Sequence, residues 1–302
     1  MPYKLVRNFL WNLRDSFRFS IKLIDKDIKE LKQKLQRLDD DLLIEHILYA
    51  IPTSNIKRPN IKTAEETIQE LINSNKSLAR FGDGEILLMD GGDLYYQNYD
   101  KRLAMRMQEI LANKQENLCV AICNDVFVPP QNIIERLRDT NHIEKYHYIY
   151  NVPQIRRMYD KYINYSMQYY STSAVLYDFT IWRSFFRGKK LVLTGCKEAF
   201  DNLKFNIYDT AQELRYEFVP NKHCFSVYDE TLTRLQAYDN EFLHILMCGP
   251  TACILASDLC KAGFKALDLG HLAKHYDWHK RGIDVAATAE NTRKFHSVDE
   301  KE

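Results

Sequence analysis

Several features that mark specialised proteins are missing from this chain of 302 residues. Its formal charge is only +1, whereas general nucleic-acid binders carry a clear basic excess, so no nucleic-acid partner is expected. The chain has no apolar run of about 18 residues, and therefore no transmembrane helix is expected. Its N-terminus has no apolar segment followed by a small-residue cleavage site, so no signal peptide is expected either.

The cysteines lack the spacing of a zinc site or of a disulfide framework. There are seven, an odd number, and no C-x-x-C pair occurs. Several lie in apolar runs such as Leu118–Cys123, which is typical of buried thiols in a reducing compartment. With a hydrophobic fraction of 45% and a charged fraction of 27%, the composition is that of a soluble globular protein, and we expect a cytoplasmic one.

Common catalytic motifs are also absent. There is no G-x-S-x-G elbow, which weakens a hydrolase interpretation. No P-loop and no three-glycine dinucleotide fingerprint occurs. His275 and His279 are four residues apart but lack the glutamate of a zinc-protease helix.

The first 20 residues are basic and aromatic, with Leu5, Phe9, Leu13 and Phe17 recurring every four residues. This pattern predicts an amphipathic helix, for which two interpretations stay open. The helix could rest on the anionic inner face of the cell membrane. It could equally dock on the body of the protein or on a partner.

Residues 21–42 form a heptad seam, in which apolar side chains alternate three and four residues apart. These are Ile21, Ile24, Ile28, Leu31, Leu35, Leu38 and Leu42. Such a seam predicts a coiled-coil helix that pairs with a second helix. The second helix could come from another copy of the chain, giving a homodimer, or from residues 43–50. Pro52 and Pro59 then mark the end of an N-terminal extension over residues 1–52.

From about residue 60 the pattern alternates between strands and helices. Strands are predicted over 77–81, 117–123, 189–194, 215–219, 242–248 and 265–269, and helices over 101–113, 131–170 and 251–261. Thr63 and Glu66 form a capping box that opens a further helix. The alternation predicts an α/β domain over 60–290, a Rossmann-like, mostly parallel sheet with helices on both faces. Residues 291–302 read as a flexible tail.

The first candidate site is Asp83-Gly-Glu85, directly after a predicted strand. Two carboxylates one residue apart can reach one hard cation, and substrate phosphates commonly complete the coordination of Mg²⁺ or Mn²⁺. Arg80, just before the turn, could hold a phosphate through two hydrogen bonds. The alternative is an ordinary turn in which Asp83 caps a helix that starts at Gly84.

Two more candidate sites follow later strands. At Gly249-Pro-Thr251 a strand passes straight into a helix, whose free N–H groups favour an anion, although an ordinary capped helix would show the same pattern. Asp268 and His271 lie where the last strand meets its exit loop. There His271 could be a metal ligand, a phosphate donor or a proton carrier, or it could be structural.

Taken together and in this order, the candidate motifs resemble those of the GT-D-type glycosyltransferases, formerly a bacterial domain of unknown function. The motifs are Arg80–Glu85, Gly249–Ala252 and Asp268–His271, the last followed by Tyr276-Asp-Trp278. The resemblance spans residues 60–285. It implies a nucleotide-sugar donor, typically UDP-glucose, and a divalent metal, Mn²⁺ or Mg²⁺, held through the D-x-E motif. It also implies a glycan or glycoprotein acceptor on the bacterial surface.

Carried onto this chain, the resemblance assigns the metal to Asp83 and Glu85 and places His271 near the reacting centre. The donor pocket would be lined by Arg80, Gly82, Gly249, Pro250, Thr251 and Asp268. The chain departs from the family where Ala273 and His275 replace acidic residues, which bears on acceptor and donor recognition. The sequence identifies no single general base, and Asp268, Asp277 and His271 all stay open for that role. A nucleotide-sugar or phosphate-ester hydrolase and a non-catalytic nucleotide-binding scaffold stay as alternatives.

Overall fold

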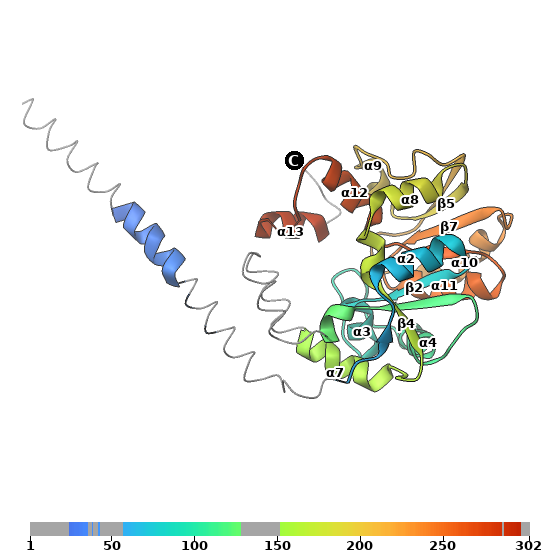
Figure 1. Cartoon of the computed structure of the whole chain (residues 1–302), viewed down its shortest axis with the longest axis horizontal. Helices are drawn as coiled ribbons and strands as arrows, with labels where there is room; N and C mark the ends of the chain where they lie inside the picture. The colour runs from blue at the N-terminus through green and yellow to red at the C-terminus, as the bar shows by residue number, and fades with distance from the viewer. Residues whose placement is uncertain are drawn as a thin grey trace, which may run out of the picture. The chain divides into compact units, whose positions relative to one another are not determined.

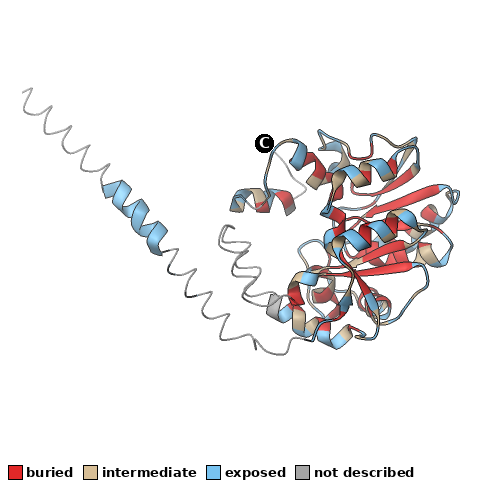
Figure 2. Cartoon of the chain, viewed as in Figure 1, coloured by how far each residue is buried: buried red, intermediate tan, exposed pale blue. Residues whose placement is uncertain are grey.

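The computed structural model describes residues 24–35, 38, 42, 57–127, 152–285 and 287–296. The predicted helix over residues 1–20 lies outside them. The chain divides into two units, Met1–Thr53 and Ser54–Glu302. In the first unit, residues 24–35 are helical, as the heptad pattern predicted. The seam residues of this helix are exposed, so their pairing with a second helix stays a prediction (Figure 2). They are Ile24, Ile28, Leu31 and Leu35.

The second unit contains an eight-stranded sheet in which every described strand pairing is parallel (Figure 1). The strands are β1 Asn60–Ile61, β2 Ser77–Phe81, β3 Leu118–Ile122, β4 Gln168–Ser171, β5 Lys190–Gly195, β6 Glu213–Phe218, β7 Phe242–Met247 and β8 Ala266–Asp268. Their order is β1-β4-β3-β2-β8-β7-β5-β6. The predicted α/β class with a parallel sheet is therefore confirmed.

Helices cover both faces of the sheet. They are α2 Ala64–Asn73, α3 Asp83–Met89, α4 Lys101–Ala112, α7 Val152–Tyr162, α8 Phe179–Phe186, α9 Lys197–Asp201, α10 Tyr228–Gln236, α11 Thr251–Lys261, α12 Leu272–Lys280 and α13 Ala289–His296. In the described residues, short 3₁₀ helices over Asn124–Phe127, Thr172–Leu176 and Cys224–Val227 connect these elements. α2, α8 and α12 share one core with alternate strand residues such as Leu78 and Leu193. α11 packs on β2 and β8 and also contacts α4 and α10. None of these helices is long and apolar enough to span a membrane.

The capping box predicted at Thr63 is present at the start of α2. The Thr63 N–H donates to Glu66 Oε2 at 2.8 Å, and the Glu66 N–H donates to Thr63 Oγ1 at 3.1 Å. Both bonds satisfy N–H groups that have no partner within the helix, which fixes where α2 begins.

Two predicted segments need correction. Within the supposed helical stretch 131–170, α7 ends at Tyr162, and residues 168–171 form strand β4 with Tyr169 and Tyr170 buried. Residues 291–296 are not a loose tail, because they belong to α13, whose Phe295 is only 2% exposed. Phe295 packs on Trp278 of α12 at 5.3 Å between ring centroids, so burial of one aromatic side chain anchors this helix.

Candidate functional site

The three candidate motifs lie at the carboxyl ends of three adjacent strands, although they are far apart in sequence. Gly82–Glu85 follows β2, Asp268–His271 ends β8, and Gly249–Thr251 follows β7; β8 lies between the other two. The chain runs from β2 to β3 and β4 on one side, and returns through β5 to β8 on the other. Parallel sheets bind ligands at such a switch point, so β2 and β8 mark the expected site.

The D-x-E turn is built by Glu85 rather than by Asp83. α3 begins at Asp83, with Gly82 at the N-cap position. The Glu85 carboxylate reaches back and accepts a hydrogen bond from the Gly82 N–H at 2.8 Å, while Asp83 Oδ1 accepts from the Gly84 N–H at 3.0 Å. The helix-cap alternative is thus partly realised, with Glu85 as the capping residue. Asp83 is left on the exposed side of the turn.

Arg80 is held by Asp268 across the switch point. Its Nε donates to the Asp268 carbonyl oxygen at 2.9 Å, and its Nη2 donates to Asp268 Oδ1 at 3.2 Å. The guanidinium lies against Gly270, which has a φ of +50°; a Cβ there would be 1.9 Å from Nη2. Gly270 is therefore required by both its backbone conformation and this close approach. Arg80 thus positions β8 against β2, in addition to the phosphate contact predicted for it.

Carboxyl groups lie close together where β2 and β8 end, at the place we call the corner of the site. Desolvation, together with the nearby charges of Asp268 and Asp83, raises the pKa of Glu85 to about 7. Desolvation also raises the pKa of Asp268, even though Arg80 is its partner. Arg80 pairs with Asp268, and the charges of Asp268 and Asp83 act on Glu85, so an added cation would stabilise this group of carboxylates.

Tyr96 forms a wall of this site that the sequence did not indicate. A Cβ on Gly84 would lie 2.9 Å from the Tyr96 hydroxyl, and a Cβ on Gly249 would lie 3.3 Å from its ring. The ring thus lies between the D-x-E turn and the β7 turn. Burial and the charges of Glu85 and Asp83 raise the pKa of Tyr96. The signal was weak, because Tyr96 sits in an irregular loop and reaches the site only through the tertiary fold.

Fewer residues of the turn after β7 are exposed to a ligand than the sequence predicted. Gly249, with a φ of +56°, is exposed, but Pro250 is buried and Thr251 is 0% exposed. The Thr251 side chain therefore packs inside the protein and does not line a donor pocket. What this turn presents to a ligand is Gly249 at the start of α11.

His271 lies at the rim of the same edge. It occupies the N-cap position of α12, next to the Gly270 contact with Arg80, and it is exposed. Its ring is 5.6 Å from that of Phe295 in α13, which packs alongside. His271 is therefore exposed at the edge of the sheet where the candidate motifs lie.

Asp277, which could have been a general base, has a structural role. It is 1% exposed and accepts hydrogen bonds from the N–H groups of Lys204 and Phe205 at 2.9 and 2.8 Å. Arg281 Nη1 also donates to it at 3.2 Å. Asp277 therefore anchors the loop after α9 and has no free face for an acceptor.

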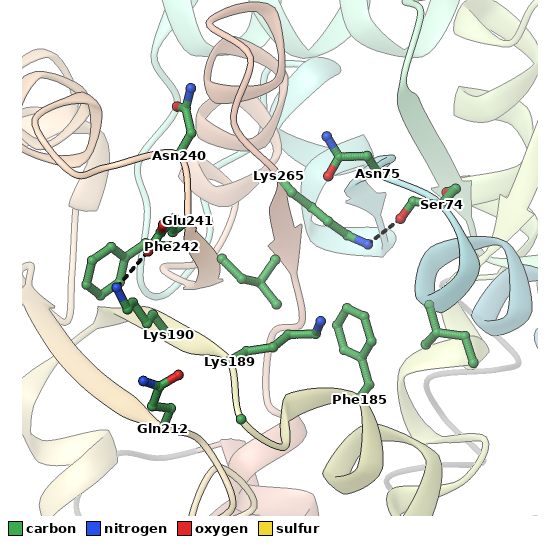
Figure 3. A pocket seen from close by; sticks show the side chains of 13 residues that line it. Ser74, Asn75, Phe185, Lys189, Lys190, Gln212, Asn240, Glu241, Phe242 and Lys265 are labelled. Atoms are coloured by element: carbon green, nitrogen blue, oxygen red, sulfur yellow. Dashed lines mark hydrogen bonds and ion pairs between the residues drawn. The ribbon is translucent and has the colours of Figure 1, made fainter.

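A cavity of about 410 Å³ opens at the amino ends of β5, β7 and β8, away from the candidate motifs (Figure 3). Its cations are used in structural contacts. Lys190 pairs with Glu241 at 2.6 Å, and Lys265 donates to the carbonyls of Leu71 and Ser74 at the end of α2. We therefore place the functional site at the opposite edge.

In the described residues, no group of three or more His, Cys, Asp or Glu side chains is arranged to hold a metal ion. Asp83 and Glu85 still suit a cation, because Mg²⁺ and related ions are commonly held by one or two carboxylates plus substrate phosphates. The raised pKa of Glu85 fits such a role, since a bound cation would favour its charged form.

Two known proteins are similar in sequence to this chain. Glycosyltransferase GlyD from Streptococcus pneumoniae serotype 4 is 27% identical over 236 residues, and the probable glycosyl transferase Gly from Streptococcus gordonii is 24% identical over 230. Each alignment covers 74% of this chain but only 28% and 33% of the two relatives. The chain thus spans about a third of their length.

Solved structures are also similar. One of a domain of unknown function 1792 matches with a TM-score of 0.65 at 26% identity, covering 81% of this chain and 86% of the other. Another, described as having a distinct glycosyltransferase fold, matches with a TM-score of 0.66 at 25% identity, covering 87% and 95%. A family model described as "Glycosyltransferase GT-D fold" matches residues 78–295. Because this match covers more than half of the chain, the protein belongs to the glycosyltransferase family with the GT-D fold.

Proposed function

We propose that this protein is a metal-dependent glycosyltransferase. It would move a hexose, glucose or a similar sugar, from a UDP-linked donor to a bacterial surface glycan or glycoprotein. The observation that carries the proposal is the switch point itself, where Asp268 pairs with Arg80 and the charges of Asp268 and Asp83 act on the Glu85 carboxyl. Ligand sites of parallel sheets occur at this position, and a nucleoside diphosphate brings phosphates that complete a two-carboxylate metal site.

Asp83 and Glu85 would hold Mn²⁺ or Mg²⁺. When bound, the cation would neutralise charge on the departing nucleoside diphosphate. Arg80 would keep Asp268 and the β8 turn in register with β2 and could reach a phosphate with its remaining N–H groups. The ring of Tyr96 and Gly249 would form the wall of the donor pocket.

We assign the acceptor proton to His271. Of the three groups that the sequence left open as general base, Asp268 is occupied by Arg80 and Asp277 by two backbone N–H groups and Arg281. His271 is exposed at the same edge, and an imidazole can accept and release a proton.

A nucleotide-sugar donor would place the reaction in the cytoplasm. All seven cysteines are free thiols, which suits a reducing compartment. Residues 1–20 would then serve as a contact with the inner face of the membrane, and residues 21–42 as a dimer contact.

The proposal is tested by turnover of UDP-glucose by the purified chain with Mn²⁺, with and without acceptor saccharides. We expect acceptor-dependent release of UDP that stops with a chelator and in Asp83→Asn and Glu85→Gln. Ser166→Ala, in a loop before β4, is the matched control and should keep full activity. Rapid release of free glucose without acceptor would favour a hydrolase. The absence of nucleotide binding by calorimetry would favour a scaffold.

A further inference from the structure

Three aromatic side chains gather at the carboxyl end of β6. Tyr216 and Phe218 are two residues apart and so point to the same side of the strand. Their rings are 5.9 Å apart at 22°, and they are 40% and 46% exposed. Phe200 of α9 packs edge-on against Tyr216 at 5.2 Å and 79°. We call Phe200, Tyr216 and Phe218 the aromatic platform.

The platform lies on one face of β6, the last strand in the sheet order. The other side of β6 is covered, because Glu217 accepts hydrogen bonds from Arg234 Nε of α10 at 2.9 Å and from the Tyr238 hydroxyl at 2.8 Å. Phe200 is partly buried against the core and supports the two exposed rings from below. The two outer rings therefore pack on each other and on Phe200 while both side chains stay partly exposed.

Folding alone does not account for this exposure. A buried aromatic side chain contributes much more to stability than an exposed one, and adjacent exposed rings commonly mark a binding surface. A pyranose ring has an apolar face of C–H groups and a rim of hydroxyls. Flat aromatic faces fit that apolar face, and the Tyr216 hydroxyl can bond the polar rim.

The platform lies at the same edge of the sheet as the turn after β7. In the sheet register Phe218 lies opposite Gly195 of β5, which lies opposite Met247 of β7, just before the Gly249 turn. With about 4.8 Å between neighbouring strands, the backbone of Phe218 is roughly 10 Å from that of Met247. The loop after Phe218 also leads to the site, since the His223 N–H donates to the Tyr96 carbonyl at 2.8 Å.

We propose that the aromatic platform binds the acceptor glycan by stacking on one of its pyranose rings. The proposal rests on the proposed glycosyltransferase function and names the surface that its acceptor would use. It assigns the donor to the switch point between β2 and β8 and the acceptor to the end of β6, on the same edge of the sheet.

The test uses the full chain with methyl β-D-glucopyranoside, methyl N-acetyl-β-D-glucosaminide and cellobiose as probes. Saturation-transfer NMR should show contact with the C–H protons of a pyranose face. In the double variant Tyr216→Thr/Phe218→Thr, binding should weaken by up to about tenfold, since a stacked aromatic contributes up to roughly a tenfold factor. Threonine keeps the strand propensity of these exposed positions.

Tyr177→Thr is the matched control, because Tyr177 is 47% exposed but lies before α8, outside the platform. It should leave sugar binding unchanged, and all variants should bind UDP-glucose with Mn²⁺ like the original chain. Equal sugar binding by the double variant would overturn the proposal. So would a loss of dimer mass in the double variant, which would make the platform a contact between copies. Sugar binding at the platform without any donor binding would instead refute the glycosyltransferase function.

Discussion

Substitution of Gly270 tests the link between β2 and β8. Alanine at a φ of +50° costs roughly 1–2 kcal/mol of backbone strain. Its Cβ, 1.9 Å from Arg80 Nη2, would also force Arg80 away from Asp268. Hydrogen bonds to charged groups contribute roughly 1.5–3 kcal/mol, so Gly270→Ala should lower the free energy of unfolding by about 2.5–5 kcal/mol in total.

Gly282→Ala is the control for backbone strain alone. Gly282 has a φ of +69°, and a Cβ added to it would meet nothing within 4 Å. This substitution should cost only the strain of about 1–2 kcal/mol. Urea denaturation followed by circular dichroism gives both values, and the difference between them reports the Arg80 contact.

A double-mutant cycle sharpens this comparison. In an Arg80→Ala background the clash is gone, so Gly270→Ala should cost no more than Gly282→Ala does. If Gly270→Ala and Gly282→Ala cost the same in the unaltered chain, Arg80 does not pack on Gly270, and the described geometry of the switch point is wrong.

Three further outcomes are expected. The pKa of Glu85 is about 7 in the folded protein and 4.5 ordinarily, so between these pH values the folded protein binds a proton that the unfolded chain has released. With chelator present, the free energy of unfolding should therefore fall as pH rises from 4.5 to 7. Glu85→Gln should remove that fall in a pH series of urea melts. The Tyr159 hydroxyl donates a hydrogen bond to the Phe81 carbonyl and accepts one from the Cys123 N–H at 3.3 Å. Tyr159→Phe removes both bonds and should lower the free energy of unfolding by roughly 1–3 kcal/mol in the same melts. No loss of stability would mean that solvent replaces both bonds. Deleting residues 1–50 should lower the mass seen by light scattering if the heptad seam forms a dimer, and an unchanged mass would remove that role.

Local signals in the sequence predicted much of this fold. The capping box at Thr63 fixed the start of α2, and α11 has the predicted bounds, because a strand, Gly249-Pro250 and an apolar helix follow one another without interruption. The positions of Gly82 and Gly270 at strand ends were also readable, since each follows a short apolar run. These features depend on neighbours in sequence.

What was missed depends on contacts between distant segments. β4 was read as part of a helix because its aromatic residues carry no strong alternation, and its pairing with β3 decides its state. Tyr96 reaches the site from an irregular loop held by the His223 N–H. Asp277 looked available for catalysis, yet backbone N–H groups of the loop after α9 occupy it. Side-chain partners of this kind follow only from the tertiary fold.

Calorimetric titration of UDP-glucose tests the central claim most directly. With Mn²⁺ present, the chain should bind the nucleotide sugar, and Asp83→Asn, Glu85→Gln or a chelator should each weaken binding by about tenfold or more, because a lost charged contact costs roughly 1.5–3 kcal/mol. Equal affinity in the unaltered chain and in both variants, with or without metal, would contradict the assignment of Asp83 and Glu85 as the metal and donor corner.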